Sequence, residues 1–316
     1  MKLLSEILGI KYPIIQGGMA QIATGRFAAA VSNAGALGVI GTGGFSPEDL
    51  RRHIREAREL TDKPFGVNIL LLHPEARELA EIAARERVSA VTTGAGDPGG
   101  FIPMWKDAGI LVLPVVAAAA LARRVERGGA DAVIAEGTES GGHVGETATM
   151  ALVPSVAAAV DIPVIAAGGI ASGAQLLAAL ALGAVGAQIG TLFLVSEECP
   201  IHENYKKALV EARDGGTTVT GRGAGVPVRV LKNRMARDYI KLEKDGAERE
   251  ELERLTLGSL RRAVRDGDTN GGSLMAGQVA GQLTGVRPAA QLLDALMREY
   301  DAARRRVSEI SEAMPV

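Results

Sequence analysis

The sequence has one cysteine, Cys199, so no disulfide can form within the chain. This suits a reducing compartment, and we predict a cytoplasmic protein. The formal net charge of −2 gives no electrostatic reason to expect binding to nucleic acid or to an anionic membrane. Glu6 and Lys11 interrupt the apolar start of the chain, and no small-residue cleavage site follows, so we predict no secretory signal.

Long uncharged runs are also scarce. The stretch 176–195 carries no charge and is long enough to span a bilayer. However, Gly183 and Gly186 divide it into a helix-like half and a strand-like half, and Gln188 lies inside the second half. We therefore predict a buried helix followed by a buried parallel strand, and no membrane span.

Short β-branched runs alternate with amphipathic helical stretches along the first 195 residues. Apolar strands that are each followed by a helix indicate a parallel sheet covered on its outer side. The first turn, QGGMAQIATG, lacks the glycine fingerprint of an open doubly wound sheet, so the pattern favours a TIM (β/α)8 barrel. The eight predicted strands are residues 13–16, 38–41, 65–70, 90–93, 111–115, 132–135, 164–167 and 187–190.

After the eighth strand the alternation stops. Residues from about Ser196 to Asn270 are polar and charged, and they look helical from about Val228 onward. We predict three segments. Residues 1–195 form the barrel, residues 196–270 form a mostly helical insertion over one mouth of the barrel, and residues 271–316 return to complete the site and end in a helix.

Glycines and small polar side chains lie where the predicted strands end. Reactive groups of TIM barrels are found at these carboxyl ends. Such residues suit a flat ligand with polar edges that the backbone approaches closely. They are Gln16, Gly17, Gly18 and Met19, Asn68, Thr92, Thr93 and Gly94, Glu136 and Gly137, Ala167, Gly168 and Gly169, and Gln188, Ile189, Gly190 and Thr191.

The last two strand ends predict a phosphate site. The segment AAGGIASG (166–173) offers amides without obstructing side chains, and Ser172 is a candidate N-cap. Anions bind at such helix N-termini because the first amides are unpaired and the helix dipole is positive. The ligand could be flavin mononucleotide (FMN), a phosphorylated sugar or an indole intermediate. Alternatively, the glycines merely permit tight turns.

The sequence lacks the residues that two kinds of catalysis require. No lysine lies at a strand end to form a Schiff base, and the four histidines are too scattered for a metal site. We expect His53 and His73 at the surface and His202 in the polar insertion. This leaves chemistry carried by a cofactor, with His143 beside it.

His143 lies in the glycine loop ESGGHVGE, just beyond the sixth predicted strand. An imidazole with an ordinary pKa near ~6.5 is suited to proton transfer at neutral pH, so His143 is a candidate general acid. It could instead only stabilise its loop by hydrogen bonding. Glu136, Glu139 and Glu146 are candidates to orient it.

Eight segments in order, from about Lys2 to Gln282, resemble the FabK-type enoyl-acyl carrier protein reductases. These enzymes belong to a superfamily with the nitronate monooxygenases (2-nitropropane dioxygenases). The segments are YPIIQGGMA, KPFGVNILLL, VTTGAG, ADAVIAEG, GGHVG, PVIAAGGIASG, QIGT and DTNGGSLMAGQVAG.

The resemblance implies a TIM barrel that holds FMN non-covalently, in a homodimer, with His143 in a catalytic role. It also implies stimulation by a monovalent cation, for which we select the NGGSLMAGQ loop with Gly272, Ser273 and Met275. The implied FMN-binding residues are Gly17, Gly18 and Met19 against the ring, Asn68, Glu136 and Gly142 nearby, Ala167, Gly168, Gly169, Gln188, Gly190 and Thr191 around the phosphate, and Met275, Gly277 and Gln278 closing the site.

The implied activity is enoyl reduction in bacterial type II fatty-acid synthesis. NADH or NADPH passes hydride through FMN to C3 of a trans-2-enoyl thioester of acyl carrier protein or coenzyme A. His143 then protonates C2 or polarises the thioester carbonyl. An acidic carrier protein could dock on the basic segment RVLKNRMAR, which contains Arg229, Lys232, Arg234 and Arg237, although this segment could equally be a solvated helix face.

The main alternative is a nitronate monooxygenase, which uses FMN and oxygen without a nicotinamide. Many of those enzymes have arginine after the histidine, whereas Val144 follows His143 here. A flavin-binding regulatory or storage protein without turnover is a third alternative. The sequence does not fix the acyl chain length, or the choice between NADH and NADPH.

Overall fold

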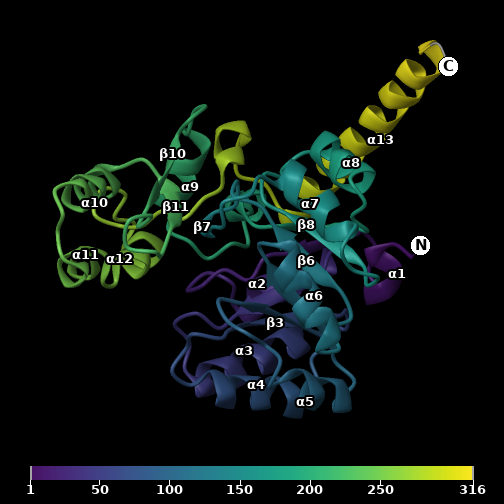
Figure 1. The fold of residues 1–316 in the computed structure, drawn as a ribbon, viewed down its shortest axis with the longest axis horizontal. Coiled ribbons are helices and arrows are strands. Elements are labelled where there is room, and N and C mark those ends of the chain that lie inside the picture. The colour runs from purple at the N-terminus through teal and green to yellow at the C-terminus, as the bar shows by residue number, and fades with distance from the viewer. Residues whose placement is uncertain (1, 315–316) are drawn as a thin grey trace.

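The computed structural model describes residues 2–314, and its centre is a closed barrel of eight parallel strands (Figure 1). The strands are β1 (Ile14–Gln16), β2 (Gly38–Gly41), β3 (Phe65–Leu70), β4 (Ala90–Gly94), β5 (Leu111–Val116), β6 (Val133–Glu136), β8 (Val164–Ala167) and β9 (Ala187–Ile189). They pair in the order β1-β9-β8-β6-β5-β4-β3-β2, and a parallel bridge between Ile15 and Leu37 closes the ring. The predicted (β/α)8 barrel is confirmed.

Helices cover the outside of the barrel. They are α2 (Gly25–Asn33), α3 (Pro47–Leu60), α4 (Ala76–Arg85), α5 (Ile102–Asp107), α6 (Ala119–Arg127), α7 (Thr149–Ala157) and α8 (Gly173–Ala181). The long α13 (Ala289–Ala313) packs on α8, where a Cβ at Gly173 would collide with the backbone of Tyr300. The short α1 (Leu4–Leu8) contributes Leu4 and Leu8 to the interior cluster and is joined to the barrel by a hydrogen bond from the Leu4 amide to the Val185 carbonyl.

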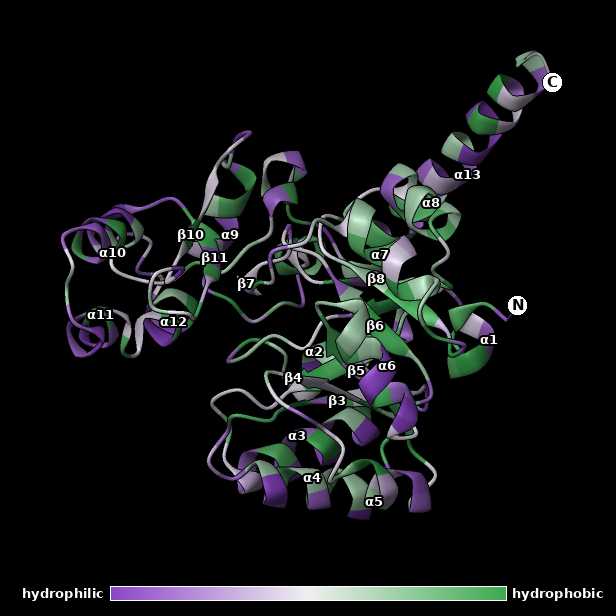
Figure 2. Ribbon diagram, in the orientation of Figure 1, coloured by the Kyte–Doolittle hydropathy of each residue, from purple (hydrophilic) through white to green (hydrophobic). Residues whose placement is uncertain are grey.

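Successive residues of each strand point to opposite sides of the barrel wall. Ile15, Ile134 and Ile165 pack with one another inside the barrel. Their neighbours Ile14 and Val133 pack instead in the layer between strands and helices. Because most strand positions are buried, the strands are mainly apolar, and polar residues such as Gln16, Asn68 and Gln188 lie toward their carboxyl ends. Figure 2 shows β6 and β8 mostly in the green of apolar residues.

The insertion begins after the 3₁₀ helix η1 (Thr191–Val195) and mixes helices with a small sheet. It contains α9 (Glu203–Val210), β10 (Thr217–Thr220), β11 (Val228–Leu231), α10 (Arg234–Lys244), α11 (Arg249–Thr256), α12 (Ser259–Arg261) and a π-helical turn η2 (Arg262–Asp266). Figure 1 shows it beside the barrel, on the side away from the C-terminus. The returning chain forms the 3₁₀ helix η3 (Gln278–Gln282) before α13.

The prediction of helix from Val228 onward is wrong at its start. Val228–Leu231 is a strand, and helix begins only at Arg234. The β-branched sequence VRVL pairs in antiparallel fashion with β10 on one side and with the two-residue strand β7 (Gly142–His143) on the other. The insertion is thereby joined to the glycine loop that follows β6.

No helix among residues 2–314 is long and apolar enough to cross a membrane. The uncharged run 176–195 lies mainly in α8, β9 and η1, so the predicted buried helix followed by a parallel strand is confirmed. The far end of α13 extends away from the rest of the molecule in Figure 1, and Val307 and Ile310 are about half exposed there.

Candidate functional site

A cavity lies at the carboxyl ends of β1, β6, β8 and β9. Its volume is about 90 Å³, below the usual ~300–1,000 Å³ range of ligand pockets, and it opens to solvent. The predicted residues that line it are Gly17, Gly18, Met19, Glu136, Ala167, Gly168, Gly169, Gln188, Gly190 and Thr191; Glu139, Ser140, Gly141, Ile170 and Val279 also line it and were not among the predicted cofactor-binding residues.

Two consecutive glycines form one wall of the cavity. Gly168 and Gly169 have φ values of 94° and 70°, in the left-handed region that glycine adopts readily. A Cβ at Gly168 would lie only 2.8 Å from the Gly137 carbonyl oxygen. Within residues 2–314, the amides of Gly169 and Gly190 have no hydrogen-bond partner, so both can donate to an anion.

The helix beyond these glycines begins as the sequence predicts. The Ser172 hydroxyl accepts a hydrogen bond from the Gln175 amide, and the Gln175 side chain accepts one from the Ser172 amide at 3.0 Å. The prediction of Ser172 as N-cap of α8 is therefore confirmed. This capping box fixes where the helix starts, so the positive end of its dipole lies just after the two glycines.

Unsatisfied polar atoms line the same cavity. The Gln188 side chain is 7% exposed, and its Oε1 has no hydrogen-bond partner in the described structure. The same holds for the Ser140 hydroxyl, also on the lining, and for the Thr138 hydroxyl two residues before it. Buried polar atoms are rarely left unpaired, so these atoms indicate a ligand with hydrogen-bonding edges. The residues thus fit a flat phosphorylated cofactor such as FMN.

Glu136, the last residue of β6, has an unusual carboxyl group. Burial raises its pKa to about 7. The residue keeps partial exposure on the cavity, but its carboxyl group is surrounded by protein. At neutral pH it is present in both protonated and ionised forms, so it can donate or accept a hydrogen bond at the ligand.

Glu139 has a structural role that the sequence did not reveal. Its carboxylate accepts hydrogen bonds from the Thr149 amide at 2.9 Å and from the Thr149 hydroxyl at 2.8 Å, at the start of α7. A carboxylate there is favourable because it pairs a free amide and faces the positive end of the helix dipole. Glu139 therefore anchors the glycine loop to α7 and is not positioned to orient His143.

His143 lies in β7, opposite Val228 of β11, and its side chain is exposed. It does not line the enclosed cavity, and no described side chain forms a hydrogen bond with it. Nearby protein atoms still lower its pKa by desolvation. The candidate partner Glu146 instead forms an exposed ion pair with Arg222 at 2.7 Å.

The prediction that His53 lies at the surface is wrong. The residue is 9% exposed and packs against Phe45, with 4.6 Å between ring centroids and an angle of 39° between the ring planes. It falls on the apolar stripe of α3 with Leu50, Ile54 and Ala57, which faces the core. His73 is partly exposed, as is His202, which accepts a hydrogen bond from the Asn204 amide at the start of α9.

Arg229 does not belong to an exposed docking patch. It is 6% exposed, and its guanidinium donates to the Thr138 carbonyl from Nε at 3.1 Å and from Nη2 at 3.0 Å. A third hydrogen bond, at 3.2 Å, reaches the Thr217 hydroxyl in β10. The residue thus joins the glycine loop to the β10–β11 hairpin. The other three basic residues of this segment are exposed.

The returning segment packs against the glycine loop. The Gly277 amide donates to the Thr191 hydroxyl at 2.9 Å, and the Gln278 amide donates to the Glu139 carbonyl at 2.9 Å. The Gln278 side chain is exposed, and Val279 lines the cavity in its place. A Cβ at Gly142 would lie 3.5 Å from the Met275 sulfur, so Gly142 and Met275 meet beside the cavity.

Asn68 of β3 packs against Gly18, just after the end of β1. Its amide donates to the Thr92 hydroxyl at 2.9 Å, and a Cβ at Gly18 would collide with the Asn68 side chain. Gly18 is thus required for this close approach. Asn68 supports the backbone that lines the cavity rather than lining it.

The loop selected for a cation is already hydrogen-bonded. The Ser273 hydroxyl lies 2.7 Å from the Ser259 hydroxyl, and the Gly272 carbonyl accepts from the Asn233 side chain at 2.8 Å. The Met275 carbonyl accepts from the Tyr205 hydroxyl at 2.8 Å. Residues 2–314 contain no group of three His, Cys, Asp or Glu side chains placed to hold a metal. The cation site remains a prediction.

A TIM barrel with an anion cradle after its last two strands is common to many phosphate-binding enzymes, so comparison with known proteins is needed to assign the family. The sequence profile described as nitronate monooxygenase matches residues 1–299, and the chain belongs to this family. The predicted resemblance to FabK-type enzymes within this superfamily is confirmed.

Three relatives illustrate the range of the family. The structure of FabK from Thermotoga maritima superposes with a TM-score of 0.95 at 46% identity, covering 99% of this chain and 100% of that one. A (3aS,4S,5R,7aS)-5-hydroxy-7a-methyl-1-oxo-octahydro-1H-indene-4-carboxyl-CoA dehydrogenase from Mycobacterium tuberculosis is 33% identical, over 93% of this chain and 94% of its own length. A probable nitronate monooxygenase from Staphylococcus aureus is 30% identical, over 94% of this chain and 97% of its own length.

Proposed function

We propose that the protein is an FMN-dependent enoyl-thioester reductase that uses NADH or NADPH. The observation that carries this proposal is the cavity at the strand ends, which combines a two-glycine anion cradle with unpaired polar atoms of Gln188 and Ser140. The 46% identity to FabK supports enoyl reduction over the other activities of the family. The substrate would be a trans-2-enoyl thioester of acyl carrier protein or coenzyme A.

Different residues of the cavity would bind the phosphate and the ring of FMN. The amides of Gly169 and Gly190, with the Thr191 hydroxyl beside them, would hold the FMN phosphate at the start of α8. Gly17, Gly18 and Met19 would lie against the flat ring, whose polar edge would pair the Gln188 and Ser140 side chains. When bound, FMN supplies the hydride relay between NAD(P)H and C3 of the enoyl group.

His143 would act on the thioester. Its lowered pKa keeps the imidazole mainly neutral at pH 7, so a neutral N–H group is available more often than an imidazolium. Of its two candidate roles, polarising the thioester carbonyl with a hydrogen bond therefore fits better than direct protonation of C2. Since the His143 side chain is exposed, the acyl group would reach it from the solvent side.

An anaerobic spectral experiment tests the proposal. The purified protein should be yellow, lose its colour on addition of NADH or NADPH, and regain it when a crotonyl thioester is added. Comparing the two nicotinamides would also identify the preferred one. A yellow protein that NADH reduces but crotonyl thioester does not reoxidise would refute enoyl reduction.

The alternative is oxidation of alkyl nitronates. It is favoured by the family profile over residues 1–299 and by the S. aureus relative. Oxygen consumption with an alkyl nitronate, without any bleaching by NADH, would support this activity.

The remaining features of the proposal concern the whole protein. We expect a cytoplasmic homodimer, stimulation by a monovalent cation, and a division of the chain at residues 195 and 270. Light scattering after size-exclusion chromatography tests the dimer, and turnover measured in potassium and in tetramethylammonium buffers tests the cation.

A further inference from the structure

One face of α13 carries an apolar stripe along most of the helix. Spacings that alternate between four and three residues keep side chains on one face of a helix and are typical of helices that pair with another helix. The residues of the stripe are Leu296, Tyr300, Ala303, Val307, Ile310 and, at the C-cap, Met314.

Burial along this stripe falls where α8 begins. Leu296 is 2% exposed, and Gly173, the first residue of α8, lies against the backbone of Tyr300. Figure 1 shows α13 continuing past α8 toward the C-terminus. The last three residues of the stripe are 50%, 48% and 64% exposed. A row of half-exposed large apolar side chains on one face is typical of an interaction surface.

Charged residues accompany the free part of the stripe in a fixed order. Because successive helical residues are turned by about 100°, Arg304 and Arg306 lie on opposite sides of the stripe. Glu309 lies farther round on the Arg306 side, and Glu312 lies farther round on the Arg304 side. None of these four forms an ion pair with a residue in the range 2–314. The free end of α13 is therefore basic first and acidic afterwards.

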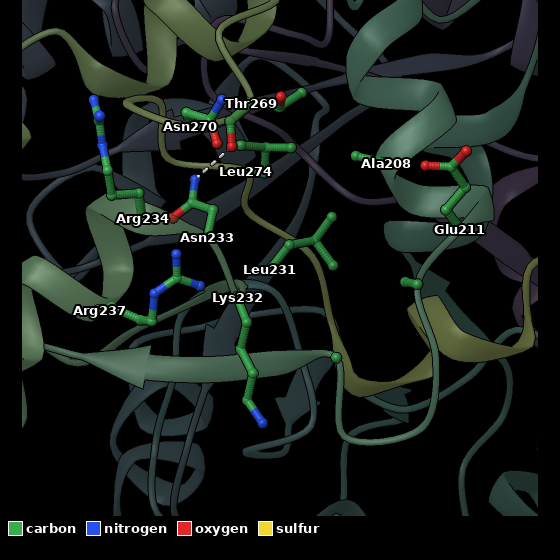
Figure 3. A pocket seen from close by; sticks show the side chains of 12 residues that line it. Ala208, Glu211, Leu231, Lys232, Asn233, Arg234, Arg237, Thr269, Asn270 and Leu274 are labelled. Carbon is green, nitrogen blue, oxygen red and sulfur yellow. Dashed lines mark hydrogen bonds between the residues drawn. The ribbon is translucent and has the colours of Figure 1, made fainter.

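The basic residues of the insertion are arranged differently. Lys232, Arg234 and Arg237 line a cavity of about 420 Å³. Figure 3 shows Lys232 and Arg237 pointing apart, so they do not converge on one partner. On α13 the arginines instead flank a single apolar stripe, and one partner can match the stripe and the charges together.

A second copy of α13, running in the opposite direction, matches the stripe. In antiparallel pairing, residue numbers rise along one helix as they fall along the other. When Val307 lies opposite Ile310 of the second copy, Ala303 lies opposite Met314 of that copy. Every exposed apolar residue of the free end then has an apolar neighbour.

The same register also pairs opposite charges. A two-fold axis relates the copies, so each side of the stripe meets the same side of the second copy. Arg306 then lies beside Glu309 on one side, and Arg304 lies beside Glu312 on the other. In a parallel pair each arginine would instead meet its own counterpart, and like charges would repel.

We propose that residues 303–314 pair with the same segment of a second copy of this chain as a short antiparallel coil of two helices. This surface would form the expected homodimer, and the inference does not depend on the proposed activity. The overlap is roughly 18 Å long at 1.5 Å per residue, and it begins just beyond the part of α13 that α8 covers. Because so short an overlap makes a small interface, the dimer dissociates on dilution.

Sedimentation velocity over a range of protein concentrations tests the surface. Ile310→Asp places two unpaired charges in the interface, so the dimer dissociation constant should rise at least about tenfold. Arg305→Glu is the matched control, because Arg305 lies on the opposite side of the helix from the stripe. FMN content should be the same in both variants. A monomer at every concentration, or a dimer indifferent to Ile310→Asp, would overturn the proposal.

Exchanged charges test whether the contacts are between two chains. Arg306→Glu and Glu309→Arg should each weaken association of the variant with itself, because like charges then meet. An equimolar mixture of the two variants should associate as the unmodified protein does, since each chain supplies the charge that the other needs. Failure of the mixture to recover would show that the charges act only within one helix, against the proposal.

Disulfide trapping tests the orientation. Cys199 is 2% exposed, so cysteines added to the free end should react first. A mixture of Ala303→Cys and Met314→Cys chains should form a cross-linked heterodimer on mild oxidation. Ala303→Cys alone should not cross-link, because its two copies would lie roughly 16 Å apart, beyond disulfide reach. Cross-linking of Ala303→Cys with itself would indicate a parallel pair and refute the antiparallel one.

Discussion

Single residues decide what the strand-end cavity can bind. Glycines at 168 and 169 leave room for a ligand, the Gln188 side-chain oxygen has no partner in the described structure, and Glu136 supplies a carboxyl group of raised pKa. Each of these residues lies at or just after the end of a strand that is held in the barrel by its own pairing and packing. The properties of the site can therefore be changed one residue at a time, with the barrel retained.

Replacing Gly169 with aspartate should expel the flavin. The side chain would have to adopt a φ of 70°, its Cβ would lie 3.2 Å from the Glu139 Cβ, and its charge would repel a phosphate. The ratio of FMN to polypeptide, measured by absorbance after gel filtration, should fall to near zero. Gly100→Asp is the control, because no heavy atom lies within 4 Å of a Cβ there. A Gly169→Asp protein with unchanged flavin content would show that the phosphate binds elsewhere.

Glu136→Gln should stabilise the protein at alkaline pH. Burial raises the pKa of Glu136 to about 7, so the folded state prefers the protonated form. The wild type therefore loses stability as pH rises from the unfolded value of ~4.5 through 7, by roughly 3 kcal/mol. Gln carries no charge, so the variant should have the higher Tm at pH 8, with the difference vanishing below pH 4.5.

The control for this pH dependence is Glu139→Gln. That carboxylate accepts hydrogen bonds at the start of α7, so its loss should lower Tm at pH 8. A Glu136→Gln protein with the same Tm advantage at pH 4.5 and pH 8 would contradict a titrating Glu136.

His143→Ala should separate the two half-reactions. FMN content and reduction by NADH should be preserved, because His143 does not line the cavity. Reoxidation by crotonyl thioester should slow about 10²-fold, the low end of the effect of a proton-transfer or polarising group. Stopped-flow absorbance measures both steps, and His73→Ala provides a matched histidine outside the site. Reoxidation at the wild-type rate would exclude a role for His143.

At the scale of elements, the small sheet β7–β11–β10 holds the glycine loop in place. Arg229 adds two side-chain hydrogen bonds from the hairpin to the Thr138 carbonyl and a third within the hairpin to Thr217. The Val144 amide donates to the Pro227 carbonyl at 3.1 Å. Buried arginines that hold backbone carbonyls leave unsatisfied acceptors when they are shortened. The hairpin and the loop should therefore loosen together.

Arg229→Ala should lower the free energy of unfolding by about 3 kcal/mol, the cost of unpairing buried polar groups. It should also increase hydrogen exchange at the Val144 amide, which mass spectrometry of the loop peptide measures. Arg222→Ala removes only an exposed ion pair with Glu146 and should cost less than about 1 kcal/mol. Unchanged exchange at Val144 would show that Arg229 does not support the loop.

For the whole molecule, the sequence predicted the barrel well, because strands buried on both faces are continuous apolar runs. The residues at their ends followed from the fold, so most of the cavity lining could be named. His53 could have been recognised as buried, since it lies on the i, i+3 stripe that starts at Leu50. The charged residues around it concealed that pattern.

Other features depend on contacts between distant segments. Strand β7 is two residues long and exists only because β11 pairs with it. Gly141, which lines the cavity, packs against the returning segment at Ala276 and Gly277. The local sequence does not predict such contacts. It also did not predict that VRVL forms a strand, because the residues that follow look helical.

The pairing of β7 with β11 also limits how the family can be recombined. His143 obtains its backbone partner from the insertion and not from the barrel. A chimera that takes its insertion from a relative would thus inherit the orientation of the histidine along with it. Exchanging the specificity of two family members therefore requires the loop 138–144 and the hairpin 217–231 to be transplanted as one unit.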